Sequence, residues 1–392
     1  MTSENMSKTK TINWLVYGEL PTGIINSQII DLADLVSNKT NFHGRIWVLS
    51  PMSAFRKFKM AYSKIDSPVK ITLLPMLPFQ GRHTLWQLNF LLLSLFSINP
   101  FKKQVWIARG PKAGSMVRFM KKLKPTISFI YQSRGSIFDE SREYASDAVP
   151  DIFVPEEREN LVSSNRVFAV SHQLVNRHEE VYDIKIKSKS IVCPTIIDSR
   201  RIPVERSNVN IASQTAELGI VNLAYLSGGQ GWQSDKTLID FLTILNENHS
   251  SLQLRYFGNP PQSTIRRQLN AMCNVEYGRV PSSLVIQELS NSDFGLLLRE
   301  ESQTNVVATP TKFAEYCAAG LIPIVSGVPF YLELLQQCEV PHLVFDCKKK
   351  CVSEQFIDRN NLRDERGKVV AFAKAHLTEN SSFFRSLTSA LS

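Results

Sequence analysis

Short apolar runs alternate with helical stretches along this chain of 392 residues, and the alternation constrains the fold more than any other feature. Strands are predicted in two series, at 12–17, 45–49, 105–108, 127–131 and 167–170, and at 221–226, 252–257, 294–298, 322–325 and 343–345. Strands that alternate with helices form parallel sheets covered on both faces. We therefore predict an α/β protein with two Rossmann-like domains facing across a cleft, with ligands at the carboxyl ends of the strands.

A polar segment at 200–208 is the predicted linker. We expect a disordered N-terminus at 1–10, a first domain at 11–203 and a second at 204–392, each long enough to bury a core. Hydrophobic residues make up 43% and charged residues 21%, as in ordinary globular proteins. The polar N-terminus lacks the apolar run of a signal peptide, so a cytoplasmic protein is expected. The six cysteines show no metal-site spacing.

The sequence PTKFAEYCAAG, which begins at Pro310, places a cation and a carboxylate on one short helix. Thr309 is the predicted N-cap, Pro310 suits the first turn, and Gly320 suits the left-handed residue that ends a helix. The helix N-terminus and Lys312 favour an anion such as a nucleotide diphosphate. Glu315 lies on the same face, where a carboxylate suits ribose hydroxyls. The alternative is an ordinary amphipathic helix with a surface Lys-Glu pair.

A glycine-rich loop follows the first strand of the second series. Ser227, Gly228 and Gly229 precede a helix predicted to begin near Asp235, and bare backbone in such a loop can approach phosphates closely. The loop matches neither the dinucleotide fingerprint nor the P-loop pattern. Lys236, in the first turn of the predicted helix, is either a phosphate ligand or an ordinary surface lysine.

Two arginines of the first domain each lie just past a predicted strand, where side chains point towards a ligand. Arg109 and Arg134 could each bind a phosphate group in bidentate fashion. The alternative is a structural salt bridge with Asp139, Glu140 or Glu143.

The excess positive charge belongs to the first half of the chain. Residues 1–200 carry 27 Lys and Arg against 17 Asp and Glu, whereas residues 201–392 carry 18 against 19. Residues 51–124 hold fourteen basic side chains and one acid, Asp66. Each basic residue near an anionic membrane contributes about 1 kcal/mol of attraction, so we predict a peripheral membrane protein. The alternatives are a solvated basic face and nucleic acid, for which no binding motif is present.

The apolar run at 85–98 is too short to span a bilayer. It is either a buried core helix or a helix that lies on the membrane surface.

These motifs resemble family 4 glycosyltransferases, which have the GT-B fold. In the branch that builds bacterial surface polysaccharides, a strand ending in arginine leads through a Ser/Asn-containing loop into a P-x-K-F-x-E-Y-x-A-x-G helix. Here the strand ends at Arg299, the loop contains Asn305, and the helix follows. Gly229 and Lys236 match the glycine and the phosphate-binding lysine seven residues later. In GT-B proteins a C-terminal helix often packs back on the first domain.

On the acceptor side, the turn containing Gly23 resembles the family's loop after the first strand, and Arg109 and Arg134 resemble its arginine-glycine turns. Two positions depart from the family pattern. Val307 stands where a second glutamate often contacts the donor sugar, and Gln230 stands where an arginine often contacts the diphosphate.

The resemblance implies a hexosyltransferase that moves a sugar from a nucleotide-sugar to an acceptor hydroxyl with retention of configuration. Lys312, Glu315 and Arg134 are the predicted catalytic residues, and neither metal nor other cofactor is expected. The predicted contacts of the nucleotide-sugar are Ser227, Gly228, Gly229, Lys236, Arg299, Asn305, Thr309, Lys312 and Glu315. The predicted acceptor-side contacts are Arg109, Arg134 and Gly23.

The basic first half suits a saccharide acceptor linked to a polyprenyl diphosphate at the inner face of the membrane. Capsule, O-antigen (lipopolysaccharide) or exopolysaccharide synthesis is the expected setting, without a nucleic-acid partner. Three alternatives remain: a nucleotide-sugar 2-epimerase of the same fold, a degenerate nucleotide-sugar-binding protein, and a nucleic-acid-binding protein.

Overall fold

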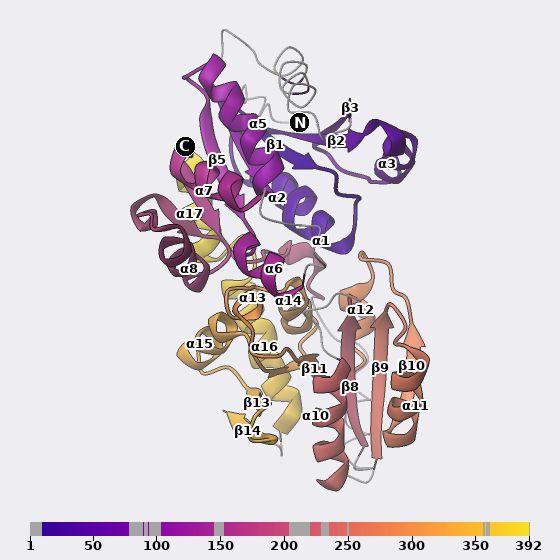
Figure 1. The fold of residues 1–392 in the computed structure, drawn as a ribbon. Helices are drawn as coiled ribbons and strands as arrows, with labels where there is room; N and C mark the ends of the chain where they lie inside the picture. Colours follow the sequence, from indigo (N-terminus) through magenta and orange to yellow (C-terminus); the bar gives the residue numbers. More distant parts are fainter. Residues whose placement is uncertain are drawn as a thin grey trace, which may run out of the picture. The chain divides into compact units, whose positions relative to one another are not determined.

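The structure, a computed structural model, describes residues 10–77, 89, 93, 103–144, 153–203, 220–228, 235–248, 251–355, 357 and 361–391. The described chain forms two compact units, Met1–Ile196 with Phe383–Ser392, and Ile197–Ser382 (Figure 1). Gly229, Gln230, the N-terminal residues 1–9 and most of the apolar run at 85–98 lie outside the described residues. None of the described helices is long and apolar enough to cross a membrane.

The first unit is built on a parallel sheet that has seven strands among the described residues, in the order β3-β2-β1-β4-β5-β6-β7. The order reverses between β1 and β4. The strands are β1 (Lys10–Tyr17), β2 (Phe42–Pro51), β3 (Lys70–Met76), β4 (Gln104–Arg109), β5 (Ser128–Ser133), β6 (Arg166–Ala169) and β7 (Ser190–Val192).

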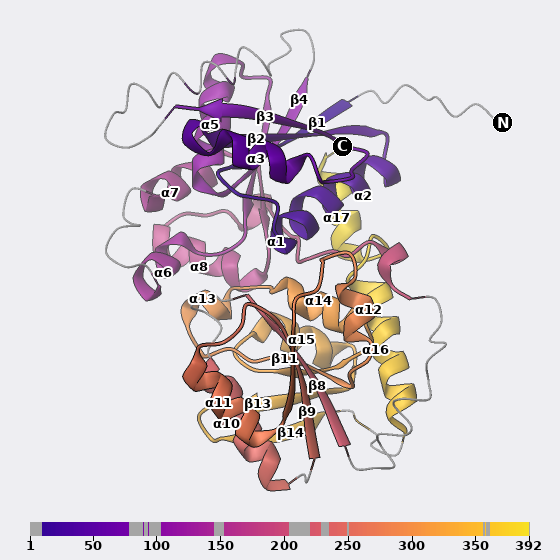
Figure 2. The ribbon, with the colours of Figure 1, turned by 90° about the vertical axis from the view of Figure 1, so that its right-hand side faces the viewer.

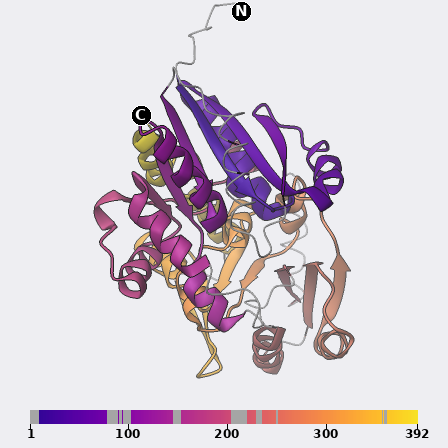
Figure 3. The same ribbon diagram turned by 45° about the horizontal axis from the view of Figure 1, so that its top comes forward.

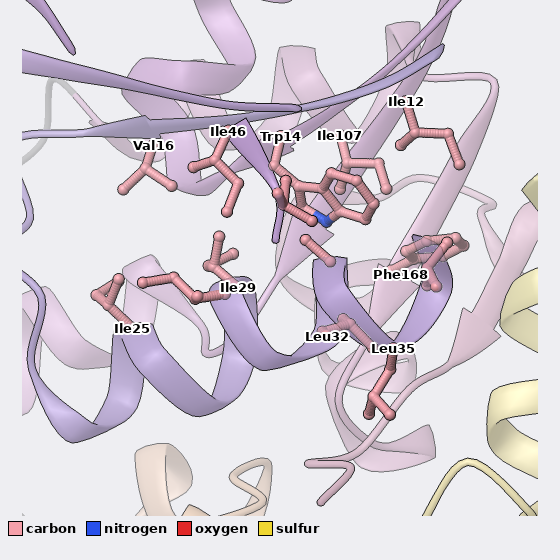
Figure 4. Close-up of a cluster of buried hydrophobic side chains, with 14 of the residues drawn as sticks. Ile12, Trp14, Val16, Ile25, Ile29, Leu32, Leu35, Ile46, Ile107 and Phe168 are labelled. Atoms are coloured by element: carbon pink, nitrogen blue, oxygen red, sulfur yellow. The ribbon is translucent and has the colours of Figure 1, made fainter. Parts of the chain in front are cut away.

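Helices cover this sheet because their apolar residues recur every three or four positions. Ile25 and Ile29 share one face of a continuous helical stretch and point towards Val16 and Ile46 of the sheet (Figure 4). The helices are α1 (Gly23–Ile25), a π-helical turn (Asn26–Ile30), α2 (Asp31–Lys39), α3 (Phe55–Tyr62), α5 (Gly110–Leu123), α6 (Ile137–Glu143), α7 (Phe153–Ser163), α8 (His172–Tyr182) and α17 (Ser382–Leu391).

The C-terminal helix α17 belongs to the first unit. Its apolar residues Phe384, Leu387 and Leu391 are buried in the same core as β1 and α2. Figure 3 shows this yellow helix beside the purple elements of the first unit. Helix α17 is therefore part of the same hydrophobic core as elements from the first forty residues.

The second unit repeats the plan. Its sheet has seven described strands in the order β10-β9-β8-β11-β12-β13-β14, all parallel except β14, and the order reverses between β8 and β11. The strands are β8 (Ile220–Ser227), β9 (Ser251–Gly258), β10 (Asn274–Gly278), β11 (Phe294–Leu297), β12 (Ile322–Val325), β13 (His342–Asp346) and β14 (Cys351–Gln355).

The helices of the second unit flank this sheet, and α16 runs beside α14 (Figure 2). They are α10 (Asp235–Asn248), α11 (Ser263–Met272), α12 (Val285–Leu289), α13 (Gln303–Val306), α14 (Thr311–Ala318), α15 (Pro329–Gln337) and α16 (Leu362–His376).

The ten strands predicted from the sequence are confirmed within a few residues at each end. The four strands that the sequence did not predict are β3, β7, β10 and β14, which form the two edges of each sheet. Their residues are mostly exposed or half-buried. An edge strand has a neighbour on one side only, so its sequence lacks the continuous apolar run that marks a buried strand.

Candidate functional site

Helix α14 lies across the point where the strand order of the second unit reverses. The hydroxyl of Tyr316 accepts a hydrogen bond from the N–H of Leu226 on β8 (2.8 Å) and donates one to the carbonyl of Leu296 on β11 (3.2 Å). A Cβ at Gly295 would lie 2.5 Å from the Tyr316 ring, so this approach requires glycine. Ligands of open α/β sheets bind at such a switch point.

The start of α14 differs from the predicted start, and its end agrees with the predicted end. The N-cap is Pro310, with no side-chain cap, and not Thr309; the helix has eight residues rather than about ten. The proline at the N-cap has an extended backbone, and its carbonyl accepts the N–H of Phe313 (3.2 Å). Gly320 has φ +67°, as predicted for the residue that ends the helix.

A buried arginine of α16 fixes the C-terminal end of α14. Arg366 donates from Nε to the carbonyl of Gly320 (3.0 Å) and from Nη2 to that of Ser290 (2.9 Å), and it pairs with Asp293. Asp293 also accepts a hydrogen bond from Asn222 (2.9 Å), on β8. These contacts tie the helix to both strands at the switch point.

Two cations lie close together near the start of α14. Arg299 is 6% exposed and donates from Nη1 to the amide oxygen of Asn305 (2.8 Å), whose own NH2 group donates to the Glu300 carbonyl (3.0 Å). Burial, reinforced by the charge of Arg299, lowers the pKa of Lys312 to about 7, and the charge of Glu315 opposes the shift. The region is therefore electropositive and suits an anion.

Two side chains in the loop before α14 are buried. The Thr309 hydroxyl has no hydrogen-bond partner among the described residues, although the residue is 5% exposed. Val307 is 1% exposed and packs as an apolar residue. A buried valine cannot make the polar contact that a glutamate makes in the family pattern.

The loop after β8 also lies at the carboxyl ends of the strands of this sheet. The Tyr256 hydroxyl hydrogen-bonds with Ser227 and Asp235, and the Gly228 carbonyl accepts from Asn259 (3.2 Å). A Cβ at Gly258 would lie 2.0 Å from the Ser227 carbonyl, which presses β9 against this loop. Lys236 is exposed, in the first turn of α10.

In the first unit, Arg109 ends β4 beside the corresponding switch point. Its Nε donates to both carboxylate oxygens of Glu19 (3.1 and 3.2 Å), just past β1, and its Nη1 donates to Gln28 (2.8 Å) in the π-helical turn. Gly110 has φ +74°, which favours glycine in this turn. The ion-pair partner of Arg109 is thus Glu19 rather than Asp139, Glu140 or Glu143.

The other predicted acceptor-side residues have surroundings of their own. Arg134 donates to the Cys193 carbonyl and to the Thr195 hydroxyl, both at 3.4 Å. Asp139 is bound in bidentate fashion by Arg177 of α8 (2.7 and 3.0 Å). Gly23 begins α1, exposed and with nothing within 4 Å of a Cβ built on it.

Comparison with known proteins supports the fold. No family model and no curated protein matches the chain. Among solved structures, HepE of Anabaena in complex with UDP and glucose has a TM-score of 0.65 at 11% identity, covering 97% of this chain and 99% of that chain. Sucrose-phosphate synthase of Thermosynechococcus elongatus has 0.62 at 12%, covering 97% and 100%. WaaG, a glycosyltransferase involved in lipopolysaccharide biosynthesis, has 0.58 at 13%, covering 93% of each.

The chain has the GT-B fold. At this identity the likeness concerns the fold, and the roles of single residues depend on the geometry of this chain. No group of three or more His, Cys, Asp and Glu side chains in the described ranges is placed to hold a metal ion.

The second unit places Arg299, Asn305 and Lys312 in one region near the start of α14. It also depends on residues that the sequence analysis missed. Gly295 has a recognisable signal, since an isolated glycine inside a strand often marks close approach of another element. Arg366 has none, because its three partners come from distant parts of the chain.

Proposed function

We propose that this chain is a glycosyltransferase that transfers a sugar from a nucleotide-sugar to a saccharide acceptor. The observation that supports it most is the close placement of Arg299 and Lys312, two cations withdrawn from water, with Glu315 one turn further along α14. Together they offer positive charge for a diphosphate and a carboxylate for the ribose hydroxyls of one nucleotide. HepE, of the same fold, binds UDP and glucose.

The proposed chemistry is electrostatic. When the bond between the sugar and the diphosphate breaks, negative charge grows on the departing phosphate oxygen. Arg299 and Lys312 would stabilise that charge in a site of low dielectric, where fixed charges act more strongly than in water. This proposal assigns the charge stabilisation to side chains of the chain and requires no metal ion.

The family resemblance adds finer features to the proposal, concerning stereochemistry, proton transfer, the acceptor and Arg134. Transfer proceeds with retention of configuration, and the departing phosphate oxygen takes the proton of the acceptor hydroxyl. The acceptor is a saccharide linked to a polyprenyl diphosphate in polysaccharide or lipopolysaccharide synthesis. Arg134, at the C-terminal edge of the first sheet, would contact a phosphate of this acceptor.

The membrane part of the proposal is supported by the surface around α3. Arg56, Lys57, Lys59 and Lys64 are exposed and form no ion pair among the described residues. Exposed Met52 and Met60 accompany these cations, with exposures of 55% and 58%. Cations mixed with exposed apolar side chains suit an anionic membrane surface.

Other basic residues of the first half are less suited to this role. Lys121 donates to the Ser163 carbonyl (3.1 Å) and the Asn165 amide oxygen (2.8 Å), contacts that occupy its ammonium at the end of α7.

Vesicle sedimentation tests the membrane role. Changing Arg56, Lys57 and Lys59 to Gln should reduce binding to vesicles with 30% anionic lipid at low salt by at least tenfold. The matched control changes Arg267, Arg363 and Lys374 to Gln, three exposed cations of the second unit, with the same loss of charge. Equal loss in both triple variants would show a general charge effect and remove α3 from the proposal.

Donor binding tests the central claim. UDP-, GDP-, ADP- and CMP-sugars are compared by thermal shift on the wild type, Glu315→Ala, and Glu333→Ala on the surface of α15. A ligand present at 100 times its dissociation constant stabilises the folded state by about 2.7 kcal/mol. We expect one nucleotide class to stabilise the wild type and Glu333→Ala, with loss in Glu315→Ala. No shift from any nucleotide-sugar would overturn the proposal.

A second candidate is nucleotide-sugar binding without transfer, which the burial of Val307 favours, because this position lacks the polar contact to the donor sugar. Incubation with the stabilising nucleotide-sugar and a panel of alkyl glycosides separates the two candidates. Release of free nucleotide together with a glycosylated product supports transfer, and donor that stays intact supports binding alone.

A further inference from the structure

The carboxylate of Glu140 accepts no hydrogen bond from the described residues, although the residue is partly shielded from water. Glu140 lies in the first turn of α6 and is half-buried. Its Oε1 lies against Gly135, where a Cβ would be only 2.1 Å away. In the part of the chain that the structure describes, no N–H or O–H donates to this carboxylate and no cation forms an ion pair with it. Its oxygens are not among the buried side-chain atoms that lack a partner, so a ligand can reach them.

A second buried glutamate of the same unit shows what a structural role looks like. Glu157 of α7 accepts hydrogen bonds from the hydroxyls of Tyr131 (3.1 Å) and Tyr182 (2.8 Å) and from the N–H of Ile137 (3.1 Å). Its 1% exposure leaves no access for a ligand. Glu140 has the opposite combination, with partial exposure and no protein donor.

Glu140 also lies where a ligand is expected. Residues 134–136 connect the C-terminal end of β5 to α6, and β5 pairs with β4, which ends at Arg109. The charge of Arg109 acts on Glu140, yet its guanidinium hydrogen-bonds to Glu19 and Gln28. The carboxyl edge of a parallel sheet is the usual place for ligands.

The neighbouring charges narrow the class of ligand. The negative charges of Glu140, Asp139 and Glu143 disfavour an anion here. No group of three or more His, Cys, Asp and Glu side chains among the described residues could hold a metal ion. A neutral hydrogen-bond donor is compatible with both observations. Sugar hydroxyls are such donors, and carboxylates accept from them strongly because the bond is charge-assisted.

We propose that Glu140 binds a hydroxyl group of the saccharide acceptor, an inference that rests on the proposed glycosyltransferase function. Because Gly135 has no side chain, the Glu140 carboxylate fits beside it at the end of β5. Arg109 hydrogen-bonds to Glu19 and Gln28 and forms no ion pair with Glu140. The acceptor thereby supplies the hydrogen bond that the protein does not.

This role predicts a pH dependence of saccharide binding. Burial raises the pKa of Glu140 to about 7, against the opposing effect of Arg109. The ionised form is the better acceptor, so binding should strengthen as the pH rises from 6 to 8. The titratable and charged groups that act on Glu140 or are acted on by it are Arg109 of β4, Tyr131 of β5, Asp139 and Glu143 of α6, and Glu157 of α7.

Saturation-transfer NMR tests the proposal with methyl glycosides of glucose, galactose, mannose and N-acetylglucosamine. Wild type, Glu140→Ala, Glu140→Gln and Glu143→Gln are compared at pH 6 and pH 8. Glu143 is an exposed carboxylate of the same helix and serves as the matched control. The melting temperature and the thermal shift with nucleotide-sugars are measured for every variant, so that folding and donor binding are judged separately.

We expect at least one glycoside to bind the wild type and Glu143→Gln, several-fold more strongly at pH 8. Glu140→Ala should lose this binding at least fivefold, and Glu140→Gln should retain part of it without the change between pH 6 and pH 8. Equal binding by wild type and Glu140→Ala, or no glycoside binding by the wild type, overturns the proposal. If nucleotide-sugars still stabilise the protein in that case, the inference about Glu140 fails while the donor site stands.

Discussion

The two units have the same sheet topology, but the arginine beside each switch point has partners of different charge. Each places an arginine at the end of the strand beyond the switch point, Arg109 as the last residue of β4 and Arg299 two residues after β11. Arg109 is held by the carboxylate of Glu19, whereas the Nη1 of Arg299 is held by the neutral amide of Asn305. The charge of Arg299 also acts on a second cation, Lys312. The same topology therefore holds an arginine paired with a carboxylate in the first unit and an electropositive region in the second.

Under the proposed function, the sheet topology sets where a ligand binds and the nearby side chains set the charge that it carries. The carboxylate of Glu140, at the carboxyl ends of the strands of the first sheet, is then matched to a neutral hydroxyl. The buried cations at the corresponding end of the second sheet are matched to a diphosphate. Exchange of such partners would change the ligand class without changing the fold.

The largest expected effect comes from Arg299→Gln. A hydrogen bond to a charged group contributes about 1.5–3 kcal/mol, so binding of the nucleotide-sugar that stabilises the wild type, measured by calorimetry, should weaken by roughly ten- to a hundredfold. Arg109→Gln, the matched change in the first unit, should leave the binding of this nucleotide-sugar unchanged. Equal weakening in both variants would show that the two arginines do not differ in the way the ion pairs indicate.

The next effect concerns the packing of α14. Gly295→Ala places a methyl group 2.5 Å from the Tyr316 ring, and overpacking of this kind costs about 1–3 kcal/mol in the free energy of unfolding. Gly367→Ala in α16 is the control, because nothing lies within 4 Å of its Cβ. That change should stabilise the protein by about 0.5–1 kcal/mol through helix propensity. Urea unfolding measures both, and a Gly295→Ala variant as stable as wild type would contradict the close approach.

The smallest effect is a pH dependence of donor binding. The pKa of Lys312 is lowered to about 7 in the free protein, and a bound diphosphate should raise it. Binding then takes up a proton, so the affinity for a nucleotide-sugar should fall as the pH rises above 7, by at most about tenfold per unit.

Calorimetry between pH 6.5 and 9 measures this dependence on wild type and Lys312→Arg. The arginine stays charged, so its profile should be flat over this range. Identical slopes for the two proteins would mean that another group is responsible.

The sequence determined the interior of both sheets and the helix that carries two of the candidate site residues. Buried central strands need continuous apolar runs, so all ten of the predicted strands are present, and the Pro310–Gly320 segment places Lys312 and Glu315 on one helix. These features depend on local periodicity and spacing, which a sequence displays directly.

Only the tertiary structure decided the edge strands and the partners of the charged residues. Edge strands carry weak patterns, because one side of each lacks a neighbour. The N-cap of α14 is Pro310 and not the predicted Thr309. Arg109 pairs with Glu19, ninety residues away, and not with the predicted candidates that are nearer in the sequence. Such contacts depend on which chain segments the fold brings together, and no spacing within one segment encodes them.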